Sequence, residues 1–171
     1  MISRRAEEMT PFLVMDVLER AHEMESQGID VVHLEVGEPD FETPEVITEA
    51  AMRAIKDGRH HYTHSLGLME LREAIAEYYA EHYGVSVDPA RVMVTAGSST
   101  AMLLVFSALL EQGQEVIISD PHYACYDNFI SFVGGVPVRV PVREEEGFQF
   151  RPAEIGAAMN PNTKAIFINS P

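Results

Sequence analysis

The pattern of apolar and polar residues changes near residue 90. Before that point, three stretches have apolar residues at helical spacing and are bounded by capping residues: about 10–28, 43–58 and 68–84. Between the first two, residues 30–36 (DVVHLEV) have a strand-like pattern that ends at the turn 37–41 (GEPDF). The N-terminal part is therefore predicted to be helical, with one short strand.

After residue 90, short apolar runs alternate with helical stretches. The runs contain few polar positions, which is typical of parallel strands buried on both faces. The expected strands are 91–95, 115–119, 136–140 and 164–168, and the expected helices begin after Ser98 and near Tyr123 and Ala153. This alternation predicts an α/β fold of three layers with a mostly parallel sheet.

We expect the chain to divide near residues 40–60 into an N-terminal helical segment and an α/β domain. The last expected strand, 164–168, runs into a turn at the final residues, whereas a parallel strand is normally followed by a crossover helix. An apolar strand without its next neighbour also leaves a row of backbone groups exposed at the sheet edge. We therefore expect the chain to be a truncated part of a larger domain.

The charge balance excludes two classes of partner. The chain has 27 acidic and 12 basic residues, and its formal net charge is -15. Such a surface repels phosphate backbones and anionic lipid, so we expect neither nucleic acid nor a membrane as a partner.

Cys125 is the only cysteine, so no internal disulfide can form. We expect a cytoplasmic protein in which Cys125 is packed rather than nucleophilic.

One stretch has the character of an anion site. The expected strand 91–95 leads through Gly97 to Ser98 and Ser99, which are good helix N-cap residues. Backbone N–H groups in the first turn of a helix lack intrahelical partners, and the helix dipole adds partial positive charge. The stretch has neither G-x-G-x-x-G nor the lysine of a P-loop. From these residues alone, a phosphate-binding turn and a capped helix without a ligand both stay open.

Five motifs, in this order and spacing, resemble the N-terminal half of the pyridoxal-phosphate-dependent aminotransferases of classes I and II, which have fold type I. The motifs are GEPDF (37–41), HYTHSLGLMELREAIAEYY (61–79), VTAGSSTAM (94–102), DPHYACY (120–126) and INSP (168–171). The resemblance covers nearly the whole chain. It implies that residues 1–45 form an N-terminal arm and part of a small domain, and that residues 46–171 begin the cofactor-binding large domain.

The resemblance also implies cofactor-binding residues. Gly97, Ser98 and Ser99 match the turn that holds the phosphate of pyridoxal 5′-phosphate in similar enzymes. Tyr123 matches the aromatic residue that stacks on the pyridine ring, a contact that suits its flat apolar face. The alternative for Tyr123 is a packing role at the start of a helix.

Two further residues match positions at the substrate and at a dimer interface. Tyr62 matches a tyrosine that relatives extend to the cofactor phosphate of a partner subunit, which implies a homodimer, and a phenol is a suitable donor to an anion. Gly37 matches a glycine whose backbone approaches the substrate carboxylate, which a residue without a Cβ allows. The alternatives are a surface tyrosine and an ordinary turn glycine.

Three clustered histidines raise the question of a metal. His60, His61 and His64 lie close together in sequence, but no carboxylate or cysteine completes a recognised ligand pattern. We therefore expect no metal site, and a solvated or packing role for these side chains.

The resemblance implies a complete enzyme that transfers an amino group from an L-amino acid to a 2-oxo acid. The lysine that forms a Schiff base with the cofactor lies far downstream in relatives, and neither Lys56 nor Lys164 matches it. We therefore assign no catalytic residue and expect the 171 residues alone to be inactive. Two alternatives stay open: a lyase or synthase of the same fold and cofactor, or a non-catalytic half-protein or sensing domain that binds the cofactor or an amino acid.

Overall fold

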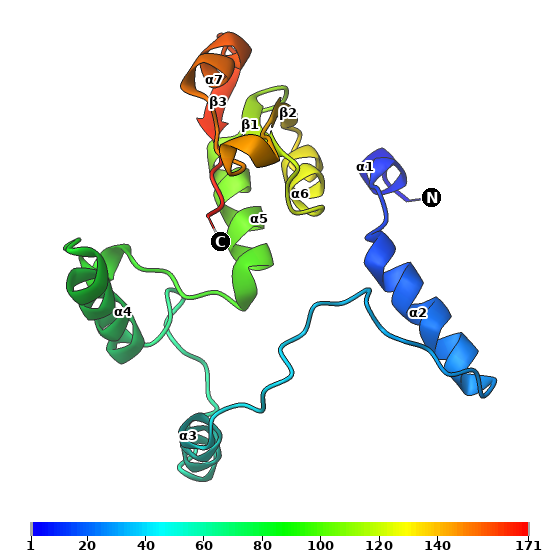
Figure 1. Ribbon diagram of the computed structural model, residues 1–171. Coiled ribbons are helices and arrows are strands. Elements are labelled where there is room, and N and C mark those ends of the chain that lie inside the picture. Colours follow the sequence, from blue (N-terminus) through cyan, green and yellow to red (C-terminus); the bar gives the residue numbers. More distant parts are fainter. Residues whose placement is uncertain (1, 171) are drawn as a thin grey trace. The chain divides into compact units, whose positions relative to one another are not determined.

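The computed structural model describes residues 2–170; Pro171, the last residue of the INSP motif, lies outside them. The elements are α1 (Arg4–Glu8), α2 (Leu13–Ser26), α3 (Glu45–Lys56), α4 (Met69–Tyr83), the 3₁₀ turn η1 (Pro89–Arg91), α5 (Gly97–Leu109), β1 (Glu115–Asp120), α6 (Tyr126–Phe132), β2 (Val136–Pro141), the 3₁₀ turn η2 (Glu144–Glu146), α7 (Pro152–Ala158) and β3 (Thr163–Ile166) (Figure 1).

Contacts between residues group the chain into two compact units. The first combines residues 1–36 with residues 98–171, and the second is residues 37–97. The first unit therefore contains the sheet, and the second contains α3 and α4. The expected domain boundary between residues 45 and 46 rests on the resemblance and stays a prediction.

The sheet has three parallel strands in the order β2-β1-β3 within the described residues (Figure 1). The central strand β1 pairs with β2 from Glu115 opposite Val136 to Asp120 opposite Pro141. Its middle residues, Val116, Ile117 and Ile118, are completely buried, which explains why this strand is apolar at consecutive positions. The α/β class and the parallel sheet are confirmed.

The main hydrophobic core lies between the sheet and two helices. Phe106 of α5 and Ile130 of α6 pack against Val116 and Ile118 of β1. Val116 and Ile118 are two residues apart, so their side chains leave the same face of the strand. This core fixes α5 and α6 against one face of β1, and both helices adjoin the segments described below as the candidate site.

The second unit has a charged group at its centre. Arg72 of α4 is 3% exposed, and its guanidinium reaches the backbone of the segment that forms η1. Helix α4 ends where Gly84 adopts a left-handed conformation with φ 65°, as the glycine in the sequence predicts.

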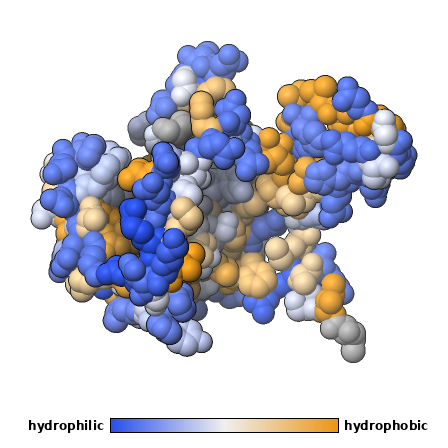
Figure 2. Space-filling model, turned by 90° about the horizontal axis from the view of Figure 1, so that it is seen from below, coloured by the Kyte–Doolittle hydropathy of each residue, from blue (hydrophilic) through white to orange (hydrophobic). Residues whose placement is uncertain are grey.

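Large apolar side chains are exposed in both units. Leu34 is 89% exposed and Phe41 is 85% exposed, and the face in Figure 2 shows hydrophobic areas beside hydrophilic ones. No helix in the part of the chain that the structure describes is long and apolar enough to cross a membrane.

Two expected strands are wrong. Residues 30–36 and 91–95 contain no β-strand in the structure. A strand needs a neighbouring strand for its backbone hydrogen bonds. Residues 91–95 instead make local turn bonds, such as Val92 N to Pro89 O, and a bond from Val94 N to Leu66 O at 3.0 Å. Both segments have the apolar pattern of a strand, but the pairing that would make them strands is not formed.

The helix boundaries also differ in two places. Helix α6 begins at Tyr126, so Tyr123 precedes the helix, and Tyr123 O accepts a hydrogen bond from Tyr126 N at 3.0 Å. Helix α1 was not predicted; its cap is Ser3, whose side chain accepts a hydrogen bond from Ala6 N.

Candidate functional site

A cavity of about 500 Å³ lies where the three parallel strands end. Its lining comes from the carboxyl end of β1, from residues after β2 and from residues after β3. The lining residues are Ser119, Pro121, His122, Tyr123, Tyr126, Val142, Gly147, Phe148, Gln149, Phe150, Ile168, Asn169 and Ser170. Ligand sites of parallel α/β sheets lie at this edge, so the cavity is the candidate functional site.

Tyr123 offers this cavity an accessible aromatic ring. The residue is 47% exposed, and its ring contacts Phe12 and Tyr126 edge-on, at centroid distances of 6.1 and 5.4 Å. A hydrogen bond with the Cys125 side chain, and then burial, raise the pKa of Tyr123 above its ordinary value. The phenol is therefore neutral at neutral pH. Phe12 and Tyr126 contact the ring edge-on, and the rest of the residue is accessible to a ligand.

Tyr126 connects the cavity to the hydrophobic core. It is 7% exposed, and its ring meets Phe167 edge-on at 4.7 Å, while Phe167 in turn contacts Phe106 of the core. Burial raises the pKa of Tyr126. Packing in the core therefore fixes the Tyr126 ring, which Tyr123 contacts.

His122, which precedes Tyr123 in the chain, lies near an ion pair between Asp127 and Arg139. His122 Nε2 is 3.4 Å from Asp127 Oδ2, and the same carboxylate oxygen accepts a short hydrogen bond from Arg139 of β2. The carboxylate raises the pKa of Arg139 through this hydrogen bond. His122 Nδ1 and Asp127 Oδ1 are buried without a hydrogen-bond partner in the described structure.

The start of α5 has the features of an anion site. The helix has 13 residues and begins at Gly97, whereas the sequence predicts that it begins after Ser98. Gly97 has φ 81°, a left-handed conformation that favours glycine, and a Cβ there would meet no atom within 4 Å. Ser98 and Ser99 therefore lie in the first helical turn, next to open space.

Gly37 and Tyr62 belong to the second unit. Tyr62 is fully exposed, with a relative exposure of 107%. Gly37 is outside the left-handed region, and a Cβ on it would meet nothing within 4 Å. Neither backbone conformation nor packing within the described chain accounts for glycine at this position.

The histidines near residue 60 are not arranged as metal ligands in the described structure. His60 and His61 have ring centroids 4.9 Å apart, whereas His64 Nδ1 accepts a hydrogen bond from Leu66 N at 3.1 Å. Across residues 2–170, no three His, Cys, Asp or Glu side chains are grouped so that they could hold a metal ion. Cys125 is half-buried beside Tyr123.

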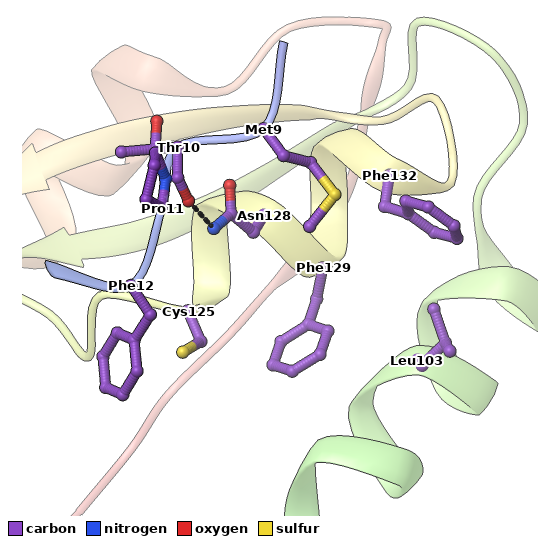
Figure 3. Close-up of a pocket in the computed structure, with 9 residues that line it drawn as sticks. All are labelled: Met9, Thr10, Pro11, Phe12, Leu103, Cys125, Asn128, Phe129 and Phe132. Atoms are coloured by element: carbon purple, nitrogen blue, oxygen red, sulfur yellow. Dashed lines mark hydrogen bonds between the residues drawn. The ribbon is translucent and has the colours of Figure 1, made fainter. Parts of the chain in front are cut away.

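A second cavity, of about 450 Å³, lies between the N-terminal arm, α5 and α6 (Figure 3). Its lining is mostly apolar: Met9, Thr10, Pro11, Phe12, Leu103, Cys125, Asn128, Phe129 and Phe132. The hydrogen bond from Asn128 Nδ2 to Thr10 O, 2.9 Å long, joins the arm to α6.

Sequence reasoning missed His122 and the residues 147–150 and 168–170 as lining of the first cavity. Residues 168–170 carry a recognisable signal, because they follow an apolar strand of a parallel sheet. The loop 147–150 carries none, since only the fold brings it to the ends of β1 and β3.

Comparisons with known proteins agree with this arrangement. A family model described as aminotransferase class I and II matches residues 29–171. The chain is 42% identical over 170 residues to an aspartate/prephenate aminotransferase of Thermus thermophilus, and 41% identical over 171 residues to a (5-formylfuran-3-yl)methyl phosphate transaminase of Methanocaldococcus jannaschii. These matches cover 99% and 100% of the chain, but only 44% of each relative.

A solved structure shows the same fold. The structure of an aspartate aminotransferase from Thermus thermophilus with maleate matches with a TM-score of 0.95 and 42% identity, over 100% of this chain and 45% of that one. The chain therefore spans less than half the length of the relatives it matches.

Proposed function

Since the chain belongs to the class I and II aminotransferase family, we propose that it serves the transfer of an amino group from an L-amino acid to a 2-oxo acid, with pyridoxal 5′-phosphate as cofactor. The observation that carries this proposal is the family match over residues 29–171. The relatives named above are transaminases, which favours this activity over a non-catalytic binding role. The name of the Thermus thermophilus relative makes aspartate the first amino donor to test.

The residues present fit the phosphate of this cofactor. Gly97 leaves open space at the start of a 13-residue helix, and Ser98 and Ser99 add hydroxyl groups to the backbone N–H groups of the first turn. Such a turn holds an anion through several short-range dipoles, which matters in a chain with a net charge of -15. We assign phosphate binding to these three residues.

Tyr123 fits the ring of the cofactor. Its ring is neutral, partly exposed and supported from the side by Phe12 and Tyr126. A planar ligand stacked on this face would exclude water from one side of its ring. When bound, pyridoxal phosphate supplies the electron sink that stabilises negative charge on the substrate α-carbon.

Gly37 and Tyr62 are assigned to the substrate and to a partner subunit. The open space around Gly37 would let its backbone approach a substrate carboxylate. The complete exposure of Tyr62 suits a side chain that donates a hydrogen bond to a second copy of the protein, in a homodimer. The single cysteine favours a cytoplasmic location.

The 171 residues contain two lysines, and neither matches the catalytic lysine of the family. Lys56 ends α3 and Lys164 lies in β3. Proton transfer at the substrate α-carbon needs a base at the cofactor. We therefore expect the 171 residues by themselves to bind cofactor without catalysing transamination.

The proposal is tested by titrating the chain with pyridoxamine 5′-phosphate, the aminated cofactor, and following ligand fluorescence. This probe has no aldehyde, so it cannot react with Lys56 or Lys164. Pyridoxamine without phosphate measures the share of affinity that the phosphate contributes. We expect the phosphorylated probe to bind at least tenfold more tightly, which equals about 1.4 kcal/mol.

Two variants separate the roles. Replacement of Ser98 and Ser99 by leucine is expected to remove most of the preference for the phosphorylated probe. Tyr123→Ala is expected to weaken both probes equally, because it removes the ring contact. Tyr83→Ala is the matched control, since Tyr83 is an exposed tyrosine on α4. Unchanged affinities in both test variants would contradict the assigned cofactor site.

A further inference from the structure

We propose that His122 is a positioning residue that holds Tyr123 in place for the cofactor ring, and that Asp127 and Arg139 hold His122. The inference rests on the proposed function, because Tyr123 is the residue assigned to the ring. It concerns three residues to which neither the motifs nor the proposed function gave a role.

Three elements meet at one carboxylate oxygen. His122 follows β1, Asp127 lies in α6, and Arg139 lies in β2. Asp127 Oδ2 is 3.4 Å from His122 Nε2, and it also accepts a short hydrogen bond from Arg139 Nη2. The His122 side chain is 11% exposed and the Asp127 side chain 23%, so their contact is largely shielded from bulk water, whereas the Arg139 side chain, 55% exposed, reaches solvent.

The imidazole shares a neighbour with Tyr123. The His122 ring lies nearly parallel to the Tyr126 ring, with an interplanar angle of 19° and a centroid distance of 6.2 Å. The Tyr126 ring also contacts the Tyr123 ring edge-on, with an interplanar angle of 67° and a centroid distance of 5.4 Å. His122 is therefore fixed by Asp127 and Tyr126, and its backbone leads directly into Tyr123.

Tyr123 needs such support. Its ring contacts are edge-on, and 47% of the residue is exposed, so packing alone constrains it less than a buried ring. A stacking residue contributes most to affinity when it is held in the bound orientation before the ligand arrives. The contact of His122 with Asp127 supplies this constraint from a shielded position one residue away.

The unpartnered atoms argue against a purely structural role. His122 Nδ1 and Asp127 Oδ1 are buried without hydrogen-bond partners in the described part of the chain, and such atoms are unfavourable in a core. A phenylalanine at position 122 would preserve a flat ring against Tyr126 and remove one buried polar group. Stability alone therefore does not favour histidine at position 122. A role in anchoring the chain before Tyr123 to Asp127 does favour it.

The first test uses the ligand-free chain. Fluorotyrosine labelling and fluorine NMR give one signal for each tyrosine, and Tyr123→Phe identifies the signal of Tyr123. We expect His122→Phe and Asp127→Asn to shift and broaden that signal. Thermal unfolding of His122→Phe should be unchanged or occur at a higher temperature. Glu23→Gln, which removes the exposed ion pair with Arg20, is the matched control and should leave the Tyr123 signal in place.

The second test uses pyridoxamine 5′-phosphate binding in a double-mutant cycle. His122→Phe should weaken binding about tenfold in the natural chain and less than twofold in the Tyr123→Ala background, because His122 acts through Tyr123. His122→Gln should restore part of the affinity, since its side-chain amide can donate to Asp127. General loss of stability would instead weaken binding equally in both backgrounds.

The outcomes separate the two proposals. An unmoved Tyr123 signal in His122→Phe, or equal losses of affinity in both backgrounds, would overturn the positioning role while leaving the cofactor site intact. If the natural chain bound no pyridoxamine 5′-phosphate, the proposed cofactor site would be wrong. The fluorine signal would then decide by itself whether His122 positions Tyr123.

Discussion

The Arg72 guanidinium donates two hydrogen bonds to the backbone carbonyl oxygen of Pro89, at 2.9 and 2.6 Å, from a position that is 3% exposed. The two residues are 17 positions apart, so this contact ties α4 to η1 within the second unit. A partly buried carbonyl oxygen is bound more strongly by a charged donor than by a neutral one.

Arg72→Met is expected to destabilise the second unit by about 2 kcal/mol, because it removes two hydrogen bonds from a charged donor and leaves the Pro89 carbonyl oxygen only the bond from Val92 N, 3.2 Å long. Urea unfolding followed by circular dichroism measures the change. Arg53→Met is the control, since Arg53 on α3 makes an exposed ion pair with Glu49 that should contribute less than about 1 kcal/mol. Equal effects of the two substitutions would contradict the assigned role of Arg72.

Gly135→Ala is expected to destabilise the first unit by about 2 kcal/mol, because a Cβ would lie 2.8 Å from Leu110 Cδ1 and 3.1 Å from the Ile130 carbonyl oxygen. Gly156→Ala is the control, and its effect on the free energy of unfolding should have the opposite sign. Gly156 lies in α7 with open space around it, so alanine should stabilise the helix by about 0.5–1 kcal/mol. Thermal unfolding of both variants tests the pair of expectations.

Asn128→Ala is expected to release the N-terminal arm. The Asn128 amide donates to Thr10 O at the lining of the apolar cavity of Figure 3, and loss of one such bond costs about 1 kcal/mol. Limited proteolysis should cleave near residue 10 faster in this variant. Ser26→Ala removes a side-chain to backbone bond within α2 and should leave that rate unchanged.

The segment after α2 is expected to loosen in alkaline solution. His33 Nε2 and Nδ1 lie 2.9 and 2.6 Å from carboxylate oxygens of Glu25 and Glu35, and its ring is 5.9 Å from that of His22. These hydrogen bonds, to Glu25 and then Glu35, raise the pKa of His33 from 6.5 to about 9. The stabilising contribution is therefore complete below pH 6.5 and is lost as the pH rises through about 9.

Amide hydrogen exchange of residues 29–36, compared with that of β1 at each pH, measures this change. The ratio of the two rates should rise near pH 9 in the natural chain. His33→Gln should show the faster relative exchange already at neutral pH and no step near pH 9. A step that persists in His33→Gln would assign the change to another group.

Local signals explain why the helices were predictable and the pairing of two strands was not. Capping residues and apolar spacing lie within a few positions of each other, as Gly84 shows at the end of α4. Whether residues 30–36 form a strand depends on a neighbour that is distant in sequence. In the structure, that segment is held instead by His33 and its two glutamates.

The candidate site divides in the same way. Gly97, Ser98 and Ser99 were predictable because a helix start is local, and Tyr123 stands out through its motif. The cavity required the parallel order β2-β1-β3, which brings residues before α6, after β2 and after β3 to one edge. Asp127 and Arg139 lie 12 positions apart, and no local pattern pairs them with His122.

The sequence by itself determined the α/β class, most helices, the three strands of the sheet and the family, because these depend on local spacing and on motifs in a fixed order. The tertiary structure decided which apolar segments pair, which residues line the cavity and what supports Tyr123. These properties arise from contacts between residues far apart in the chain, and only folding brings those residues within reach of one another.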